Sequence, residues 1–171
     1  YQPSRGLGDV YKRQILTIAN NDARIGHGVD ITFAETGYDG SGTTVAIIDT
    51  GLDGNHSSLD DQDDDPATYD PKILGFYDAV NSPDDTSGNI YPFDDQGHGS
   101  HCGGTTAGTG APTYEHPGMA PQAHLVGVKV LGADGSGSFA GVMAGMQWTI
   151  DTMHQYNTCL LYTSPSPRDG W

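Results

Sequence analysis

Short apolar runs separated by polar, glycine-rich stretches dominate the pattern of this chain. Residues 43–50 (TTVAIIDT), 72–80 (KILGFYDAV) and 124–131 (HLVGVKVL) are such runs, and each is too short for a typical helix. Apolar runs of this length and composition are typical of strands that are buried on both faces of a sheet. The pattern therefore predicts three buried strands.

Two further segments have the features of helices. Residues 98–108 are small and rich in Gly and Thr, so they can form a helix that packs closely against a sheet. Ser138 follows the turn GADGSG and is a candidate N-cap for a second helix. Its apolar residues recur at helical spacing and predict about four amphipathic turns. These residues are Phe139, Val142, Met143, Met146, Ile150 and Met153.

Alternating strands and helices predict an α/β fold with a mostly parallel sheet flanked by helices. Ligands of such sheets bind at the carboxyl ends of the strands, which is where Asp49 closes the first strand. Residues 15–42 lack a sustained period and are interpreted as an approach segment. No apolar run is long enough to span a membrane.

The two ends of the chain are related through their coding sequence. A DNA segment that encodes residues 4–14 also encodes, on its other strand and one base out of frame, residues 159–168. An adapter ligated to both ends of a DNA fragment explains this symmetry, and the function of a protein does not. We therefore interpret residues 1–14 and 159–171 as adapter-derived and exclude them from fold reasoning.

The remaining segment is strongly acidic. The whole chain carries a formal charge of -15, and residues 15–158 contain 20 acidic residues against Arg24, Lys72 and Lys129. This balance argues against a nucleic-acid partner, which requires clustered Lys and Arg. It fits a secreted or salt-exposed protein. Cys102 is the one cysteine of this segment, so no disulfide can form within it.

Two short motifs carry candidate chemistry. Asp49 is followed by Thr50 and Gly51, and alone this triplet favours a turn or helix-capping aspartate. The same triplet occurs in aspartic proteases, but a single copy would then require a dimer. His98 lies between glycines and could serve as a general base if a carboxylate held its far nitrogen. His98 and His101 could instead share a metal, although the sequence lacks the spacing and Glu of the zincin motif.

Taken together, these motifs resemble the subtilisin-like (S8) serine proteases. VAIIDTGLDGNH resembles the aspartate motif of that family, and DDQGHGSHCGGTTAG resembles its histidine motif. GMAPQAHLVGVKVLGADGSGSFAGVMAGMQW resembles the strand, substrate edge and helix that follow. The resemblance covers about residues 42–150 and implies a partial subtilisin-like three-layer fold. Residues 43–158 would be the N-terminal part of the catalytic domain, and residues 15–42 could be the end of a pro-region.

The resemblance implies a serine endopeptidase that hydrolyses peptide bonds by acyl transfer. Asp49 would orient His98, and His98 would act as general base and then as general acid. The segment that pairs with the substrate backbone would include Leu131, Gly132, Gly135, Ser136 and Gly137. An exposed edge of this kind accepts an extended peptide as an added strand. Cys102 lies inside the histidine motif and is interpreted as a small buried apolar residue.

The nucleophile is absent from the chain. In the family, the Gly-Thr-Ser motif and the asparagine of the oxyanion hole would follow residue 158, and Ser164 and Ser166 belong to the adapter. This chain alone should therefore be inactive and, lacking the rest of its domain, should expose apolar surface and aggregate. A catalytically dead relative that serves as a binding domain, and a metal-dependent hydrolase, remain alternatives.

The resemblance implies polypeptide substrates, an extracellular location and a pro-segment upstream. No cofactor is required for the expected reaction, and no metal ligand is assigned. The acidic residues 60–65 could hold a structural calcium ion. They lack the spacing and glycine of an EF-hand loop, so we interpret them as a solvated acidic loop.

Overall fold

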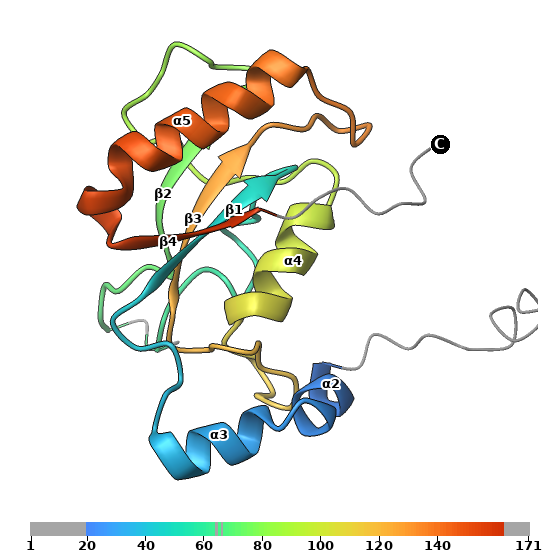
Figure 1. Cartoon of the computed structure of the whole chain (residues 1–171), viewed down its shortest axis with the longest axis vertical. Helices are drawn as coiled ribbons and strands as arrows, with labels where there is room; N and C mark the ends of the chain where they lie inside the picture. Colours follow the sequence, from blue (N-terminus) through green and yellow to red (C-terminus); the bar gives the residue numbers. More distant parts are fainter. Residues whose placement is uncertain (1–19, 64, 66, 163–171) are drawn as a thin grey trace, which may run out of the picture.

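A parallel sheet forms the centre of the molecule in the computed structural model, which describes residues 20–63, 65 and 67–162 (Figure 1). All strand pairs are parallel, and the strand order is β2-β3-β1-β4. Most of the expected adapter-derived residues lie outside the described part of the chain. The strands are β1 (Thr44–Asp49), β2 (Ile73–Asp78), β3 (His124–Lys129) and β4 (Thr158–Tyr162).

Both faces of the inner strands are buried, as their continuous apolar runs predicted. Ala46 and Ile48 of β1 belong to one core cluster, and Ile47 between them belongs to the other. Leu125 and Val126 of β3 divide in the same way. Successive side chains of a strand point to opposite faces, so each run supplies two separate cores.

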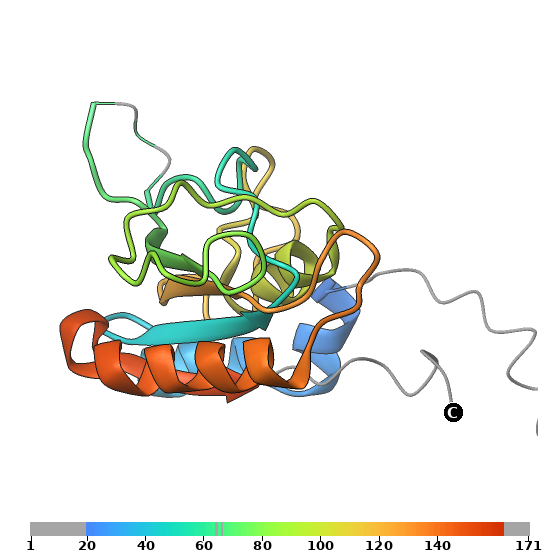
Figure 2. The ribbon, with the colours of Figure 1, turned by 90° about the horizontal axis from the view of Figure 1, so that it is seen from above.

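One helix covers each face of the sheet, and the predicted three-layer α/β fold is confirmed. Helix α4 (His98–Ala107) packs on the cluster of Ile47 and Leu125, and α5 (Phe139–Tyr156) packs on the other cluster. Figure 2 shows α5 along one side of the strands and α4 on the far side. The sheet therefore forms the middle layer.

The two helical connections cross the sheet with opposite hands. Both the β2-α4-β3 and the β3-α5-β4 connection move in the same direction along the strand order, yet their helices lie on opposite faces. The connection through α5 has the usual right hand, and the connection through α4 is left-handed, which is rare between parallel strands. The left-handed connection places α4 over β1 on the face opposite α5.

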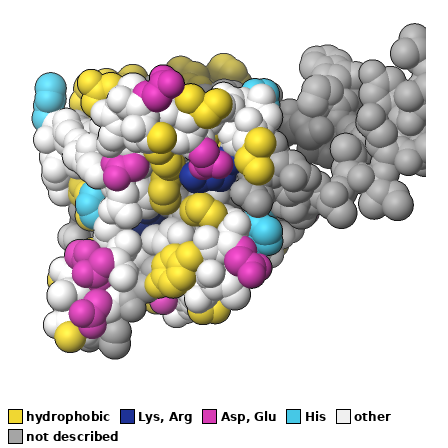
Figure 3. Space-filling model, turned by 90° about the horizontal axis from the view of Figure 1, so that it is seen from below, with side chains coloured by type: hydrophobic (Ala, Val, Ile, Leu, Met, Phe, Trp, Pro, Cys, Tyr) yellow, Lys and Arg dark blue, Asp and Glu magenta, His cyan; other side chains and the backbone are white. Residues whose placement is uncertain are grey.

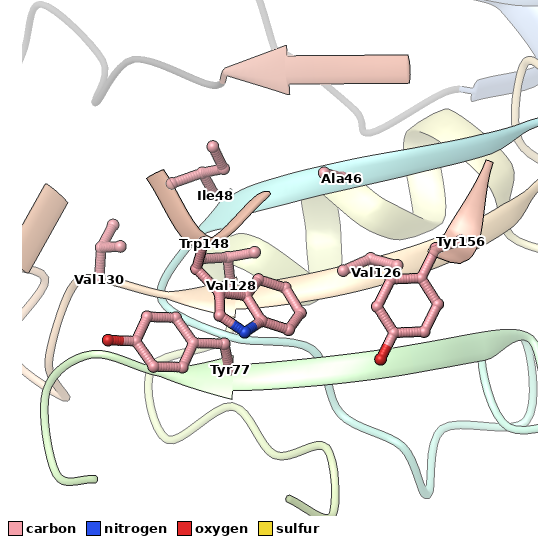
Figure 4. Packing of buried hydrophobic residues seen from close by; sticks show 8 residues of the cluster. All are labelled: Ala46, Ile48, Tyr77, Val126, Val128, Val130, Trp148 and Tyr156. Atoms are coloured by element: carbon pink, nitrogen blue, oxygen red, sulfur yellow. The ribbon is translucent and has the colours of Figure 1, made fainter. Parts of the chain in front are cut away.

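Helix α5 begins as predicted, with the Ser138 hydroxyl accepting a hydrogen bond from the Gly141 amide at 2.9 Å. Its buried face, however, differs from the expected one. Trp148 and Tyr156 pack on the sheet, and Trp148 stacks on Tyr77 with ring centroids 5.3 Å apart (Figure 4). Val142 and Met146 are partly buried beside them, whereas four members of the predicted stripe are exposed: Phe139, Met143, Ile150 and Met153. The helix has two apolar faces, and the aromatic one packs on the sheet.

The approach segment contains two short helices that the pattern did not predict, α2 (Asn20–Gly26) and α3 (Val29–Thr36). Helix α3 buries none of its residues, so it carries no amphipathic period that the sequence could reveal. Arg24 anchors this segment. Its buried guanidinium donates to the Gly118 carbonyl and pairs with Asp30 at 2.6 Å.

Strand β4 includes residues 159–162, which belong to the string interpreted as adapter-derived. The backbone of this strand pairs with β1 in parallel register, with Val45 beside Cys159 and Ile48 beside Tyr162. An uncovered edge of a sheet offers unpaired N–H and C=O groups to any extended apolar segment. The exclusion of these residues from fold reasoning left this strand unpredicted.

Candidate active site

The carboxylate of Asp49 lies at the carboxyl end of β1 and is fully buried. The amide of Thr50 donates a hydrogen bond to its Oδ1 at 2.7 Å. The imidazole of His98 lies against the carboxylate, with Nδ1 at 2.8 Å from Oδ1 and 2.9 Å from Oδ2. The carboxylate is therefore held in one orientation by its own strand end and by the histidine.

His98 begins α4, directly after Gly97, whose φ of 101° lies in the region that favours glycine. The His98 amide donates to Oε1 of Gln96 at 2.8 Å. The side chain of His98 keeps 38% exposure while its partner has none. One edge of the ring thus contacts a buried carboxylate, and the other edge faces the surface.

The glycines of both motifs let α4 approach the end of β1. A Cβ on Gly99 would overlap the carbonyl oxygen of Gly51, and a Cβ on Gly51 would overlap the carbonyl oxygen of Phe93. Gly51 also has a φ of 126°. Side chains at these positions would push the helix away from the strand and separate His98 from Asp49.

This pair can perform general acid–base chemistry. A carboxylate only accepts hydrogen bonds, so Nδ1 of His98 carries the proton in this pair. Nε2 then presents a lone pair that can take a proton from a hydroxyl nucleophile and return it to a leaving group. The structure thus brings together the two residues that the sequence predicted as catalytic.

Cys102 lies one helical turn after His98, with its Sγ at 3.8 Å from Nδ1 of His98. It is half-buried and packs against the cluster that contains Ile47 and Leu52. This position agrees with its interpretation as a small apolar residue. Its sulfur also lines the inner edge of the imidazole.

Two groups of described residues bring three potential metal ligands within 4.8 Å of one another: Asp49, His98 and Cys102, and Asp61, Asp63 and Asp70. His101, considered as a partner of His98 for a metal, belongs to neither group. It is exposed and lines a cavity of about 360 Å³ together with His56 and His116. This cavity adjoins the Asp49–His98 pair through Gly97 but is not lined by either residue.

The carboxylates of Asp61, Asp63 and Asp70 meet in the acidic loop. Oδ1 of Asp70 is buried and has no hydrogen-bond partner among the described residues. The neighbouring Asp61 side chain, burial and the charge of Asp63 raise the pKa of Asp70 to about 6. The Asp70 carboxyl therefore keeps its proton in weak acid.

The predicted substrate segment forms a tight turn after β3. The Gly132 amide donates to the Ser136 carbonyl at 2.8 Å, and the Gly135 amide donates to the Gly132 carbonyl at 2.9 Å. The Leu131 amide donates to the Asp49 carbonyl at 3.2 Å, which ties the turn to the end of β1. Within the described part of the chain, no backbone hydrogen bond uses Gly137. Of the five predicted residues, Gly137 is thus the one whose N–H and C=O both take part in none of these backbone hydrogen bonds.

Lys129 supports both the strand end and the substrate segment, and the sequence analysis did not identify this role. Its fully buried Nζ donates to the carbonyls of Thr50 at 2.6 Å and Leu131 at 2.8 Å. It also pairs with Asp95 at 2.6 Å. A lysine inside an otherwise apolar strand was the available signal, because a buried charge needs partners.

The described surface presents no lysine or arginine, since Arg24, Lys72 and Lys129 are all buried. On the face in Figure 3, acidic side chains are spread over the surface and basic ones appear only as recessed atoms. Such a surface would repel a phosphate backbone. Among the described helices, none combines the length and apolar character needed to cross a bilayer.

Comparison with known proteins places these features in a family. The Subtilase family model matches residues 40–160. Serine protease AprX of Bacillus subtilis (strain 168) is 34% identical over 146 residues, which cover 85% of this chain and 28% of that protein. A cuticle-degrading serine protease of Arthrobotrys oligospora is 42% identical over 113 residues, which cover 66% of this chain and 23% of that protein.

Solved structures agree with this assignment. A cold-adapted subtilisin-like serine proteinase matches with a TM-score of 0.50 and 31% identity, over 67% of this chain and 34% of that one. The CspB protease of Clostridium perfringens shares the fold, with a TM-score of 0.67 and 22% identity over 87% of this chain and 34% of that one. The chain spans about a third or less of the length of these relatives. On this evidence the chain belongs to the subtilase family.

Proposed function

We propose that this chain is the N-terminal part of the catalytic domain of a serine endopeptidase. The contact of 2.8 Å between Nδ1 of His98 and Oδ1 of Asp49 carries the proposal. His98 takes the proton of a serine hydroxyl supplied by the rest of the protein, and the serine oxygen attacks the peptide carbonyl. His98 then protonates the leaving amine, and Asp49 stabilises the imidazolium. Water, deprotonated by His98, then attacks the acyl-serine ester and releases the acid and the free serine, so the reaction requires no cofactor.

The proposed substrate is an extended polypeptide that pairs with the backbone of Gly137. A Cβ on Gly137 would overlap the carbonyl oxygen of Val130, so this edge lies tightly against the end of β3. Leu131, at the start of the same turn, is held by Lys129 and by the Asp49 carbonyl. These bonds support a fixed distance between the Gly137 backbone and His98. Main-chain pairing would supply affinity with little dependence on sequence.

The acidic surface fits the proposal of an extracellular location, and the proposal of a pro-segment upstream rests on the family resemblance alone. Over the described residues no Lys or Arg is exposed, and an acidic surface of this kind disfavours association with nucleic acid and anionic membranes. Secretion is tested by expressing the full reading frame in an organism related to the source and measuring how much of the protein is in the cells and how much is in the medium. Mass spectrometry of the mature N-terminus would reveal a removed pro-segment.

The function is tested on the protein expressed from the full reading frame. A fluorophosphonate probe should label one serine covalently, and His98→Ala should abolish that labelling, since a serine hydroxyl needs its base to attack the probe. Asp85→Asn, an exposed substitution remote from the pair, is the matched control and should leave labelling intact.

Two alternatives predict other results. A catalytically dead relative would bind peptides without reacting with the probe, and its reading frame would lack a Gly-Thr-Ser motif. A metal-dependent hydrolase would lose peptidase activity in a chelator and retain stoichiometric metal on purification. Either result would overturn the proposed function.

A further inference from the structure

The first turn of α4 is held by side chains from outside the helix. The first N–H groups of a helix have no partner within it and must be satisfied elsewhere. In α4 the amide of His98 donates to Gln96, that of Gly99 to the Thr50 hydroxyl at 2.9 Å, and that of Ser100 to Asp94 at 2.9 Å. Gly97 supplies no side-chain cap.

The Thr50 hydroxyl joins this helix start to β1. It accepts from the Gly99 amide and donates to Oδ1 of Asp94 at 2.9 Å. Thr50 is 1% exposed, so both bonds are shielded from water. Thr50 directly follows Asp49 and Gly99 directly follows His98, so this link fixes the neighbours of both catalytic residues.

The Asp94 carboxylate is the centre of the network. Oδ1 accepts from Thr50 and from the amides of Gln96 and Gly97, and Oδ2 accepts from the amide and hydroxyl of Ser100. The Ser100 hydroxyl also accepts from the Asp53 amide at 2.9 Å, which adds a second link to the segment after β1. A negative charge at a helix start is further favoured by the helix dipole.

Asp94 remains charged over the range in which such an enzyme would act. Burial opposes its ionisation, but hydrogen bonds from Gly97, Ser100 and Gln96 outweigh burial and lower the pKa of Asp94 to about 2. Its contribution to stability is therefore present above about pH 4 and is lost as the pH falls towards 2.

We propose that Thr50 and Asp94 form a clamp that docks the first turn of α4 on the end of β1 and so positions His98 against Asp49. Both are positioning residues, because neither contacts the reacting atoms. The predicted effect of the clamp on turnover rests on the proposed function. The geometry of the Asp49–His98 pair can be measured even if the proposed function is wrong.

The test compares Thr50→Val, Thr50→Ser and Asp94→Asn in the protein from the full reading frame. Valine keeps the shape of threonine but neither donates nor accepts, whereas serine keeps the hydroxyl. Asp85→Asn is the control, since Asp85 caps a turn at the Ser87 amide away from the site. Ser100→Ala, which leaves the Thr50–Asp94 bond in place, should have an intermediate effect.

Two readouts separate positioning from folding. The downfield proton resonance of His98 Nδ1–H reports its bond to Asp49, and it should vanish or shift in Thr50→Val and Asp94→Asn. With a peptide substrate, the same variants should lose about 100-fold in kcat at unchanged KM, as expected for a base displaced by about 1 Å. Thr50→Ser should retain both the resonance and kcat.

The clamp is refuted if Thr50→Val and Asp94→Asn, with native circular dichroism, keep the native resonance and kcat. If either variant fails to fold, Ser100→Ala decides by the same two readouts. A protein that has the native resonance but no peptidase activity would overturn the proposed function alone, because the resonance would still report the clamp.

Discussion

Nδ1 of His98 lies 2.8 Å from Oδ1 of Asp49, although 49 residues separate the two along the chain. The contact joins the end of a buried strand to the start of a helix, and the glycines on both sides permit that approach. It is the geometric basis of the predictions that follow.

Asp49→Asn should lower kcat of the full-length enzyme by about 10⁴-fold, because the amide would favour the wrong tautomer of His98. Steady-state kinetics on a peptide substrate measure this loss. Asp85→Asn, which neutralises an exposed carboxylate elsewhere, should have no effect. An Asp49→Asn enzyme with native kcat would show that this carboxylate does not orient the base.

Gly137→Ala should raise KM for extended peptides and leave short ester substrates almost unaffected. The added Cβ would overlap the Val130 carbonyl and force the edge to shift, which disrupts pairing with a peptide backbone but spares the Asp49–His98 pair. Kinetics with a long and a short substrate measure the difference. Ala133→Ser, an exposed change in the same turn, is the control, and equal effects on both substrates would contradict backbone pairing at Gly137.

The acidic loop should loosen as the pH rises through about 6, the value to which the Asp61 side chain, burial and Asp63 raise the pKa of Asp70. A raised pKa means that the folded loop is favoured by the bound proton. This stabilisation is complete below about pH 4 and lost above 6. The Gln62 amide donates to the Asp70 carbonyl, so its protection from hydrogen exchange should fall as the loop loosens.

Asp70→Asn mimics the protonated state and should make the protection factor of the Gln62 amide, its exchange rate relative to that of an unfolded peptide, independent of pH between 4 and 7. Addition of calcium at pH 7 separates the two interpretations of the loop. A solvated acidic loop would show no change, whereas strong protection from exchange would show that the three carboxylates hold a cation.

The chain of 171 residues should aggregate through the outer face of α5. Phe139, Met143, Ile150 and Met153 form a stripe there with exposures of 82%, 50%, 51% and 41%. Exposed apolar stripes of this kind promote association. Met143→Lys with Ile150→Lys should increase the soluble monomer, as measured by light scattering.

Ala144→Lys with Gln155→Lys adds the same charge at exposed positions beside the stripe and is the matched control. If both double substitutions increase the soluble monomer equally, the cause is the added charge and not the loss of the apolar stripe. A wild-type chain that is monomeric and melts cooperatively would refute the predicted aggregation.

The sequence by itself determined three of the four described strands, the two main helices and the pairing candidates Asp49 and His98. Continuous apolar runs specify buried strands because both faces of the sheet are covered, and Ser138 specifies a helix start because its hydroxyl satisfies a free amide. Asp49 and His98 were predictable because their motifs, taken together and in order, resemble those of the subtilisin-like serine proteases, and the glycines around them permit the close approach that the structure shows.

Only the tertiary structure decided which surfaces and side chains meet. Local pattern could not choose between the two apolar faces of α5, and it did not identify the left-handed connection through α4 or the pairing of residues 158–162 with β1. It also missed the partners of Thr50, Asp94 and Lys129. Hydrogen bonds between distant segments depend on how close two elements approach, and that distance is set by the packing of the whole domain rather than by any one segment.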